Sequence, residues 1–277
     1  MSRENDVVAA IEKRKSVRSY DGRPLSAEDL ATVRALMNGA NNPFGEKVKL
    51  HLLEDVAAAG VGKCGTARDA RSVLGVSAPI TELSPLAIGY QFESLILGAT
   101  ACGLSTVWMA TGFKRAKFEK AMGVHGDQWL AVIAPVGYAA ARPGSAEVIT
   151  RKLLRADERE MWRDIFTEDG FQIQLTEEQA GDYAQPLEML RWAPSARNGQ
   201  PWRIVKKENV FYFYETHKSS LSDQEKRLKQ IELGAAIAHF HLTAQSLGLK
   251  GHFDRKPLRD VHIPENTFYH ISWVMDE

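Results

Sequence analysis

The sequence predicts an α+β protein in which two pseudo-symmetric halves are fused in one chain of 277 residues. Residues 89–108 resemble residues 234–253, with matched pairs at Gly89/Gly234, Leu97/Leu242, Ala99/Ala244, Gly103/Gly248 and Leu104/Leu249. The apolar run 129–138, typical of a central strand covered on both faces, is repeated by the C-terminal strand 268–274. An internal duplication is the simplest explanation. We expect each half to form a mostly antiparallel sheet with helices around it.

Composition excludes several classes of partner. The chain is 44% hydrophobic and 25% charged, which is enough to bury a sizeable core. Lys plus Arg equals Asp plus Glu at 35 each, so no net field attracts nucleic acid or a membrane surface, and we expect neither partner. The polar start and the two isolated cysteines predict a cytoplasmic protein with no secretory signal and no cysteine-based zinc site, and we expect no other metal site.

The first half begins with a predicted helix at 7–15 and an extended segment at 16–20. The period of two in an extended chain would turn Arg14, Ser16 and Arg18 toward one side, where two guanidinium groups and a hydroxyl could converge on a phosphate. The alternative is a solvated helix end, because cations are favoured at a helix C-terminus.

The rest of the first half alternates helices and strands. An N-cap signal at Ser26 opens a helix that reaches about Met37, and Gly103 ends a long buried helix. The expected elements are a strand at 48–53, the buried helix at 85–104, a strand at 105–109, a helix at 114–122 and the strand at 129–138.

Residues 60–65 match the pattern GxGxxG of dinucleotide-binding folds. Residues 54–59 separate these glycines from the preceding strand, and no long helix pattern follows them. A Rossmann fold therefore stays a distant alternative. His239 and His241 stand two apart on a helix, so we interpret them as core or surface residues and not as metal ligands.

Small residues at 139–145, including Pro143 and Gly144, indicate a linker. We therefore expect the halves to be 1–145 and 146–277, intertwined as one functional unit. A basic pair, Arg151 and Lys152, follows the linker.

The second half contains a compact polar loop at 194–202. Prolines at positions 194 and 201 stiffen it, while Ser195, Asn198 and Gln200 offer donors and acceptors at defined spacing. Such a loop can recognise the edge of a flat polar heterocycle. The alternative is an ordinary turn that leads into the strand at 203–205.

Two segments together resemble hallmarks of the FMN-dependent nitroreductase family: Arg14-Lys15-Ser16-Val17-Arg18-Ser19-Tyr20 and Pro194-Ser195-Ala196-Arg197-Asn198-Gly199-Gln200-Pro201-Trp202. Residues 110–113 and 136–138 extend the likeness over most of the chain. In that family an intertwined homodimer builds two flavin sites, each from the basic segment of one subunit and the loop of its partner. Here the two segments lie in different halves, and Asn42-Pro43-Phe44-Gly45 stands where the first half would carry its own loop. The chain thus resembles a subgroup in which a monomer acts as a pseudo-dimer with one flavin site.

The resemblance implies a set of FMN-binding residues. The phosphate would be held by Arg14, Lys15 and Ser16, helped by Arg151 and Lys152. Arg18 would lie beside the pyrimidine edge of the flavin, and Thr111 with Gly112 would approach its central ring near N5. The second half would line the flavin with Pro194, Ser195, Ala196, Asn198 and Gln200. The resemblance requires no catalytic side chain, because N5 of the flavin carries the hydride.

The resemblance also implies an activity. The chain would use NAD(P)H to reduce nitroaromatics, quinones or similar flat electrophiles in a ping-pong reaction. The alternative is a flavin-binding or scaffolding protein of the same fold that does not turn over. The acceptor, the choice between NADH and NADPH, and further self-association stay open at this point.

Overall fold

The computed structural model describes residues 3–276 and divides the chain into two compact units. The first unit is Glu12–Ala156, and the second unit combines Met1–Ile11 with Asp157–Glu277. The division falls within helix α1 (Arg3–Lys13). The halves 1–145 and 146–277 are inferred from the sequence repeat and not from compactness, so they stay a prediction.

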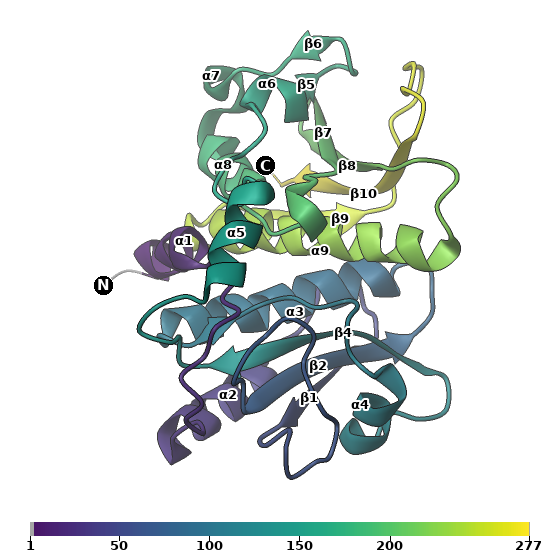
Figure 1. The fold of residues 1–277 in the computed structure, drawn as a ribbon. Coiled ribbons are helices and arrows are strands. Elements are labelled where there is room, and N and C mark those ends of the chain that lie inside the picture. Colours follow the sequence, from purple (N-terminus) through teal and green to yellow (C-terminus); the bar gives the residue numbers. More distant parts are fainter. Residues whose placement is uncertain (1–2, 277) are drawn as a thin grey trace. The chain divides into compact units, whose positions relative to one another are not determined.

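The first unit is a sheet with helices on both faces (Figure 1). Its strand order is β1-β2-β4-β3, and all neighbouring strands are antiparallel. Its elements are α2 (Ala27–Gly39), β1 (Lys49–Leu53), β2 (Ser72–Pro79), α3 (Ser84–Ala101), β3 (Ser105–Thr106), α4 (Arg115–Met122), β4 (Gln128–Gly137) and α5 (Ser145–Leu153).

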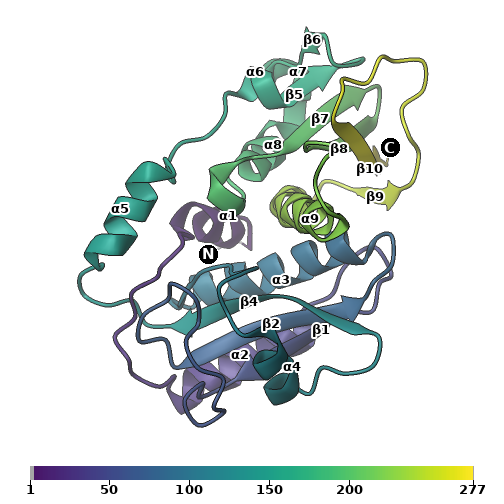
Figure 2. The same ribbon diagram turned by 45° about the vertical axis from the view of Figure 1, so that its right-hand side comes forward.

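The core of this unit lies on both sides of the sheet. Helix α3 lies along one face (Figure 2), where Leu86, Ile88 and Phe92 are almost completely buried. On the other face, Phe118 of α4 belongs to one apolar cluster with Val73 and other residues of the sheet. Strand β4 is therefore covered on both faces, as its continuous apolar sequence predicts.

The second unit is also built around a sheet. Its strand order is β6-β5-β7-β8-β10-β9, in which β5 and β7 are parallel and the other neighbours are antiparallel. Its elements are α6 (Trp162–Ile165), β5 (Phe166–Glu168), β6 (Ile173–Gln174), α7 (Glu177–Ala180), the 3-10 turn η1 (Gly181–Tyr183), α8 (Ala184–Arg191), the 3-10 turn η2 (Ala196–Asn198), β7 (Trp202–Lys207), β8 (Val210–Thr216), α9 (Asp223–Ser246), β9 (Gly251–Asp254) and β10 (Thr267–Met275).

Aromatic side chains fill the core between α9 and this sheet. Phe240 packs edge-on against Trp273 at 5.9 Å between ring centroids, and the Trp273 Nε1 donates to the Tyr183 hydroxyl at 3.1 Å. His239 and His241 both lie in this core, which is one of the two positions expected from the sequence. The His239 Nδ1 lies 3.0 Å from the Met189 carbonyl, and burial lowers the pKa of His241 to about 4.

The two units repeat one topology, which confirms the predicted α+β fold with two pseudo-symmetric halves. The order β1-β2-β4-β3 recurs as β7-β8-β10-β9, and a long helix follows the second strand each time. Both helices end in the same way. Gly103 and Gly248 have φ of 83° and 76°, and the next residue donates its N–H back to Ala99 or Ala244 at 2.9 Å.

Local departures from the predicted elements have identifiable causes. The strand expected at 105–109 is shortened to Ser105–Thr106, and Met109 rejoins the sheet only as an isolated bridge to Ile133. Thr176 forms a capping box at the start of α7, but this helix ends after one turn at Gly181, whose φ is 56°. Helix α5 was not expected.

The GxGxxG stretch lies in the connection between β1 and β2. These strands are antiparallel neighbours, and residues 54–71 between them contain no helix. A dinucleotide fold needs a strand that leads directly into a helix, so the Rossmann alternative is wrong. Within residues 3–276, no helix combines the length and apolar character needed to cross a membrane.

The fold predicts that Gly251→Ala is strongly destabilising. A Cβ at this position would lie 2.5 Å from two carbons of the Trp273 ring and 2.5 Å from the Val274 carbonyl oxygen. Trp273 is 1% exposed, so neither neighbour can move freely. We expect a loss of about 2 kcal/mol or more in the free energy of unfolding, measured by urea denaturation. Gly39→Ala is the control, because no atom lies within 4 Å of its added Cβ; equal stability of the two variants would contradict this packing.

Candidate functional site

The basic segment 14–18 lies in the first unit and is extended, as predicted. Ser16 forms a parallel bridge with Thr106, and the Val17 N–H donates to the Thr106 carbonyl at 3.0 Å. On the other side, the Arg68 N–H donates to the Arg18 carbonyl at 2.8 Å. The backbone of the segment is therefore held on both sides, which fixes the directions of its side chains.

Arg14 is the most informative residue of this segment. Its side chain is 6% exposed, and its Nε lies 3.7 Å from the Oε1 of Glu93, whose Oε2 accepts from the Trp108 Nε1 at 2.7 Å. Burial lowers the pKa of Arg14 and Glu93 opposes that shift, but a guanidinium stays charged in either case. Among the residues that the structure describes, the buried Nε and Nη1 of Arg14 have no hydrogen-bond partner.

An unpartnered buried donor costs about 1–3 kcal/mol, so two of them on one cation call for an acceptor. A phosphate fits because it is anionic and offers several acceptor oxygens to one guanidinium.

Helix α5 adds a third guanidinium to this region. Glu147 and Arg151 are four residues apart on α5 and thus share a face. Glu147 accepts from the Arg18 N–H at 2.9 Å, while the charge of Arg151 lowers the pKa of both Arg14 and Arg18. The structure therefore brings together three guanidinium groups and two carboxylates, with a net positive charge.

Other residues expected near the phosphate are less enclosed. Ser16 is half-buried, whereas Lys15 and Lys152 are exposed. Sequence signals for α5 do exist: Gly144 precedes it, Glu147 lies in its first turn and Arg151 in its last. Glu93 was missed because a single acid in an apolar helix carries no local signal.

Thr111 and Gly112 lie in the exposed turn before α4. Gly112 has φ of 83°, and a Cβ added to it would lie 3.5 Å from the Cα of Gly65. The structure thus places this turn against the end of the glycine stretch 60–65, where Gly65 and Gly112 allow two backbone segments to approach closely.

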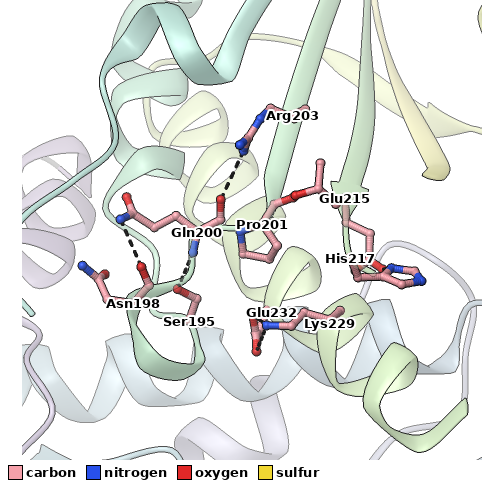
Figure 3. Close-up of polar contacts among 10 residues, drawn as sticks. Ser195, Asn198, Gln200, Pro201, Arg203, Glu215, His217, Lys229 and Glu232 are labelled. Carbon is pink, nitrogen blue, oxygen red and sulfur yellow. Dashed lines mark hydrogen bonds and ion pairs between the residues drawn. The ribbon is translucent and has the colours of Figure 1, made fainter. Parts of the chain in front are cut away.

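The loop 194–202 lies in the second unit and is held by its own polar side chains (Figure 3). The Gln200 N–H donates to the Ser195 Oγ at 2.9 Å, and the Gln200 Oε1 accepts from the Glu160 N–H at 2.9 Å. The Asn198 Nδ2 donates to the Glu158 carbonyl at 3.0 Å. Gln200 is 3% exposed, so its side chain builds the loop from inside. Pro194 is half-buried and Ala196 is exposed.

The backbone of this loop is strained. Arg197, Asn198 and Gln200 have φ of 55°, 57° and 42°, in the left-handed region that non-glycine residues avoid. Asn tolerates this conformation, but for other residues it costs about 1–2 kcal/mol each. Strain of this kind persists where surrounding contacts enforce it and is concentrated at functional sites.

Glu232 of α9 supports the loop from below and was missed by the sequence analysis. Its carboxylate accepts a hydrogen bond from the backbone of Ala196 and lies 3.0 Å from the Lys229 Nζ. Burial raises the pKa of Glu232 to about 7, with a smaller contribution from the charge of Glu215. The Glu232 carboxyl, which contacts the loop backbone, therefore holds its proton to a higher pH than an exposed glutamate does.

A second buried acid lies at the end of β8. Glu215 is fully buried, and its Oε1 lies 2.7 Å from the Nδ1 of His217. Glu215 pairs across the sheet with Trp202, where the loop enters β7. Through this pairing, Glu215 and His217 lie next to the point where the loop 194–202 enters the second sheet.

The turn at 42–45 in the first unit differs from this loop. The Asn42 Nδ2 donates to the Gln91 Oε1 at 2.9 Å, and its Oδ1 accepts from the Phe44 N–H at 3.2 Å. The turn is closed onto α3 by these bonds. Its positive φ is at Gly45, where glycine carries no steric cost.

Comparison with known proteins gives one family and a set of related folds. The model of the family described as "Putative TM nitroreductase" matches residues 6–244. A crystal structure of a Thermotoga maritima protein described as a nitroreductase covers 99% of this chain and 94% of its own, at 19% identity and a TM-score of 0.63. No curated protein gives a significant match.

Other solved structures match about half of the chain. A Bacteroides fragilis nitroreductase with bound FMN covers 49% of this chain and 89% of its own, at 18% identity and a TM-score of 0.42. An iodotyrosine deiodinase bound to FMN and 3-iodo-L-tyrosine covers 50% and 92%, at 20% identity and a TM-score of 0.41.

The raised pKa of Glu232 predicts a pH-dependent stability that Glu232→Gln removes. Between the ordinary value of 4.5 and the folded value of about 7, the folded state holds a proton that the unfolded state releases. The contribution of Glu232 to stability is therefore full below about pH 4.5 and declines as the pH rises to 7. Glu232→Gln does not titrate and keeps an acceptor for the Ala196 N–H.

We expect the variant to gain stability relative to the parent between pH 5 and 7, in urea unfolding curves measured at each pH. Glu178→Gln, at an exposed position of α7, is the control. A difference between Glu232→Gln and the parent that stays constant with pH would contradict the assignment.

Proposed function

Because the chain belongs to this nitroreductase family, we propose that it is an FMN-dependent oxidoreductase that uses NAD(P)H to reduce nitroaromatics, quinones or similar flat electrophiles. Family membership supports the flavin-dependent oxidoreductase. The observation that carries the proposal to this chain is the buried Arg14, whose Nε and Nη1 form no hydrogen bond with any described residue, although the Glu93 carboxylate lies 3.7 Å from Nε. Bound FMN would supply hydride transfer at N5.

The first unit would bind the phosphate of FMN. Arg14 and Arg151 would neutralise its charge, and the Ser16 hydroxyl would donate a hydrogen bond. Lys15 and Lys152, being exposed, would add long-range attraction and not a buried contact. Glu93 would keep Arg14 oriented when no phosphate is present.

Arg18 would lie beside the pyrimidine edge of the flavin. Its N–H donates to Glu147 and its carbonyl accepts from the Arg68 N–H, so its backbone is held without help from a ligand. A cation there stabilises negative charge that develops on the ring during reduction, which is how the protein tunes the cofactor. Gly112, with a positive φ and no side chain, would let the backbone approach the ring closely.

The loop of the second unit would form the other wall of the flavin site. Pro194, Ser195, Ala196, Asn198 and Gln200 would line it. Since Ser195, Asn198 and Gln200 already bond to the backbone of the same unit, the wall is preorganised and loses little entropy on binding. We propose that the monomer acts as a pseudo-dimer with the halves 1–145 and 146–277 intertwined.

The flavin content of purified protein tests this proposal. We expect FMN at one per chain, because the basic segment and the strained loop each occur once, and anaerobic addition of NADH or NADPH should bleach the flavin absorbance. Bound FMN that neither nucleotide bleaches would identify the non-catalytic alternative. Protein that neither retains nor binds FMN would refute the proposal, and a ratio of two would assign a working site to the turn 42–45.

Arg14→Ala should weaken FMN binding about ten- to a hundredfold. It removes a charge-assisted contact to phosphate worth roughly 1.5–3 kcal/mol. The measurement is FMN titration of apoprotein, with thermal melts of the same samples. Arg23→Ala is the control, because Arg23 is exposed and pairs with Asp21. Normal FMN affinity in Arg14→Ala, together with a lower apoprotein melting temperature, would give Arg14 a purely structural role.

A further inference from the structure

A cavity of about 490 Å³ opens in the first unit beside Gly112. Its walls come from the glycine stretch, through Val61 and Lys63, and from the turn and first helical residues of α4, through Phe113, Lys114 and Lys117. Its volume lies within the range of small-molecule sites. We refer to it as the lysine pocket.

The charge of the lysine pocket has one sign. Lys114 and Lys117 are three residues apart at the start of α4 and so share a face, and Lys63 joins them from a separate segment. The lining includes no acidic residue, and within residues 3–276 none of the three lysines forms an ion pair. The whole chain is neutral, with 35 basic and 35 acidic residues, so this excess of positive charge is local.

The wall of the pocket also carries an aromatic side chain. Phe113 is half-buried, packs edge-on against Phe118 at 5.3 Å between centroids, and lies under the Arg115 guanidinium at 4.9 Å. Val61 is 1% exposed and belongs to the core cluster behind the pocket. An aromatic face held in place next to three unpaired ammonium groups suits a ring that carries an anionic group.

We propose that the lysine pocket binds the anionic group of a substrate. Two sources share this chemistry: a phosphate of the nucleotide reductant and the carboxylate of an aromatic acceptor. The choice of these sources rests on the proposed function, because the pocket shares Gly112 with the candidate flavin site. The anion offsets the mutual repulsion of the lysines, and Phe113 contacts the adjoining ring.

Direct binding tests the pocket without turnover. Inorganic pyrophosphate is titrated calorimetrically into the purified protein at low ionic strength, and the same titration is repeated with the triple variant Lys63→Gln/Lys114→Gln/Lys117→Gln. We expect binding about tenfold weaker or more in the triple variant, and weaker binding of the parent as salt is added. Lys120→Gln, on α4 but outside the pocket, should bind as the parent does. No binding to the parent, or equal binding to the triple variant, would overturn the proposal.

Kinetics distinguishes the two sources. A rise in KM for NADPH and NADH in the triple variant, with acceptor KM unchanged, assigns the pocket to the reductant. A rise in KM for 4-nitrobenzoate but not for neutral 4-nitrobenzyl alcohol assigns it to the acceptor. Unchanged KM for all four substrates overturns the proposal. Pyrophosphate binding that depends on the lysines in a protein without reductase activity would refute the proposed function and leave the anion site standing.

Discussion

Burial of the Arg14 guanidinium is the constraint on which the candidate site depends. A guanidinium cannot escape the cost of desolvation by losing its proton, unlike a buried lysine or carboxyl group. Glu93, at 3.7 Å, offsets part of that cost, and Trp108 holds Glu93 in turn. A well-packed apolar side chain would fill the same volume without needing this support. In the first unit, a residue of α3 and a residue after β3 thus support the buried charge of Arg14. This arrangement is explained if the Arg14 guanidinium binds a ligand.

In the loop 194–202 of the second unit, the cost that surrounding contacts must offset is backbone strain and not a buried charge. Its polar side chains are used to hold left-handed residues in position, and Glu232 secures the Ala196 N–H from the adjacent helix. What the loop presents outward is consequently a rigid surface whose shape is fixed before a ligand arrives. In both units, the residues most visible in the sequence are supported by buried acids that the sequence does not reveal.

Local rules made part of this structure predictable. A helix that ends in a left-handed residue needs glycine, so Gly103 and Gly248 mark equivalent ends and expose the duplication. Helix α5 escaped prediction because its apolar residues are not a core face: Val148, Ile149 and Leu153 are 50%, 58% and 77% exposed. Glu93 and Glu232 escaped because the contacts that tie them to the candidate site, with Arg14 for Glu93 and with Ala196 for Glu232, join residues far apart in the sequence. Whether a buried acid belongs to a network depends on its tertiary contacts. The pattern of residues along a single helix does not predict those contacts.

The duplication also suggests why one half carries the basic segment. In the register that aligns Gly89 with Gly234, Arg14 aligns with Arg159, whereas three other residues of the Arg14 region meet partners of different chemistry: Lys15/Glu160, Ser16/Met161 and Glu93/Ala238. The second half thus keeps one arginine and loses the hydroxyl, the second cation and the orienting acid. Arg159 donates to the carbonyls of Glu158 and Trp192 at 2.8 and 3.3 Å, and its guanidinium lies 5.4 Å from the Trp192 ring centroid. The Nη1 and Nη2 donors of Arg159 serve the packing of its own unit, and Glu160 stands where the first half has the cation Lys15, so the charge pattern here is less favourable to a phosphate than that of the first half.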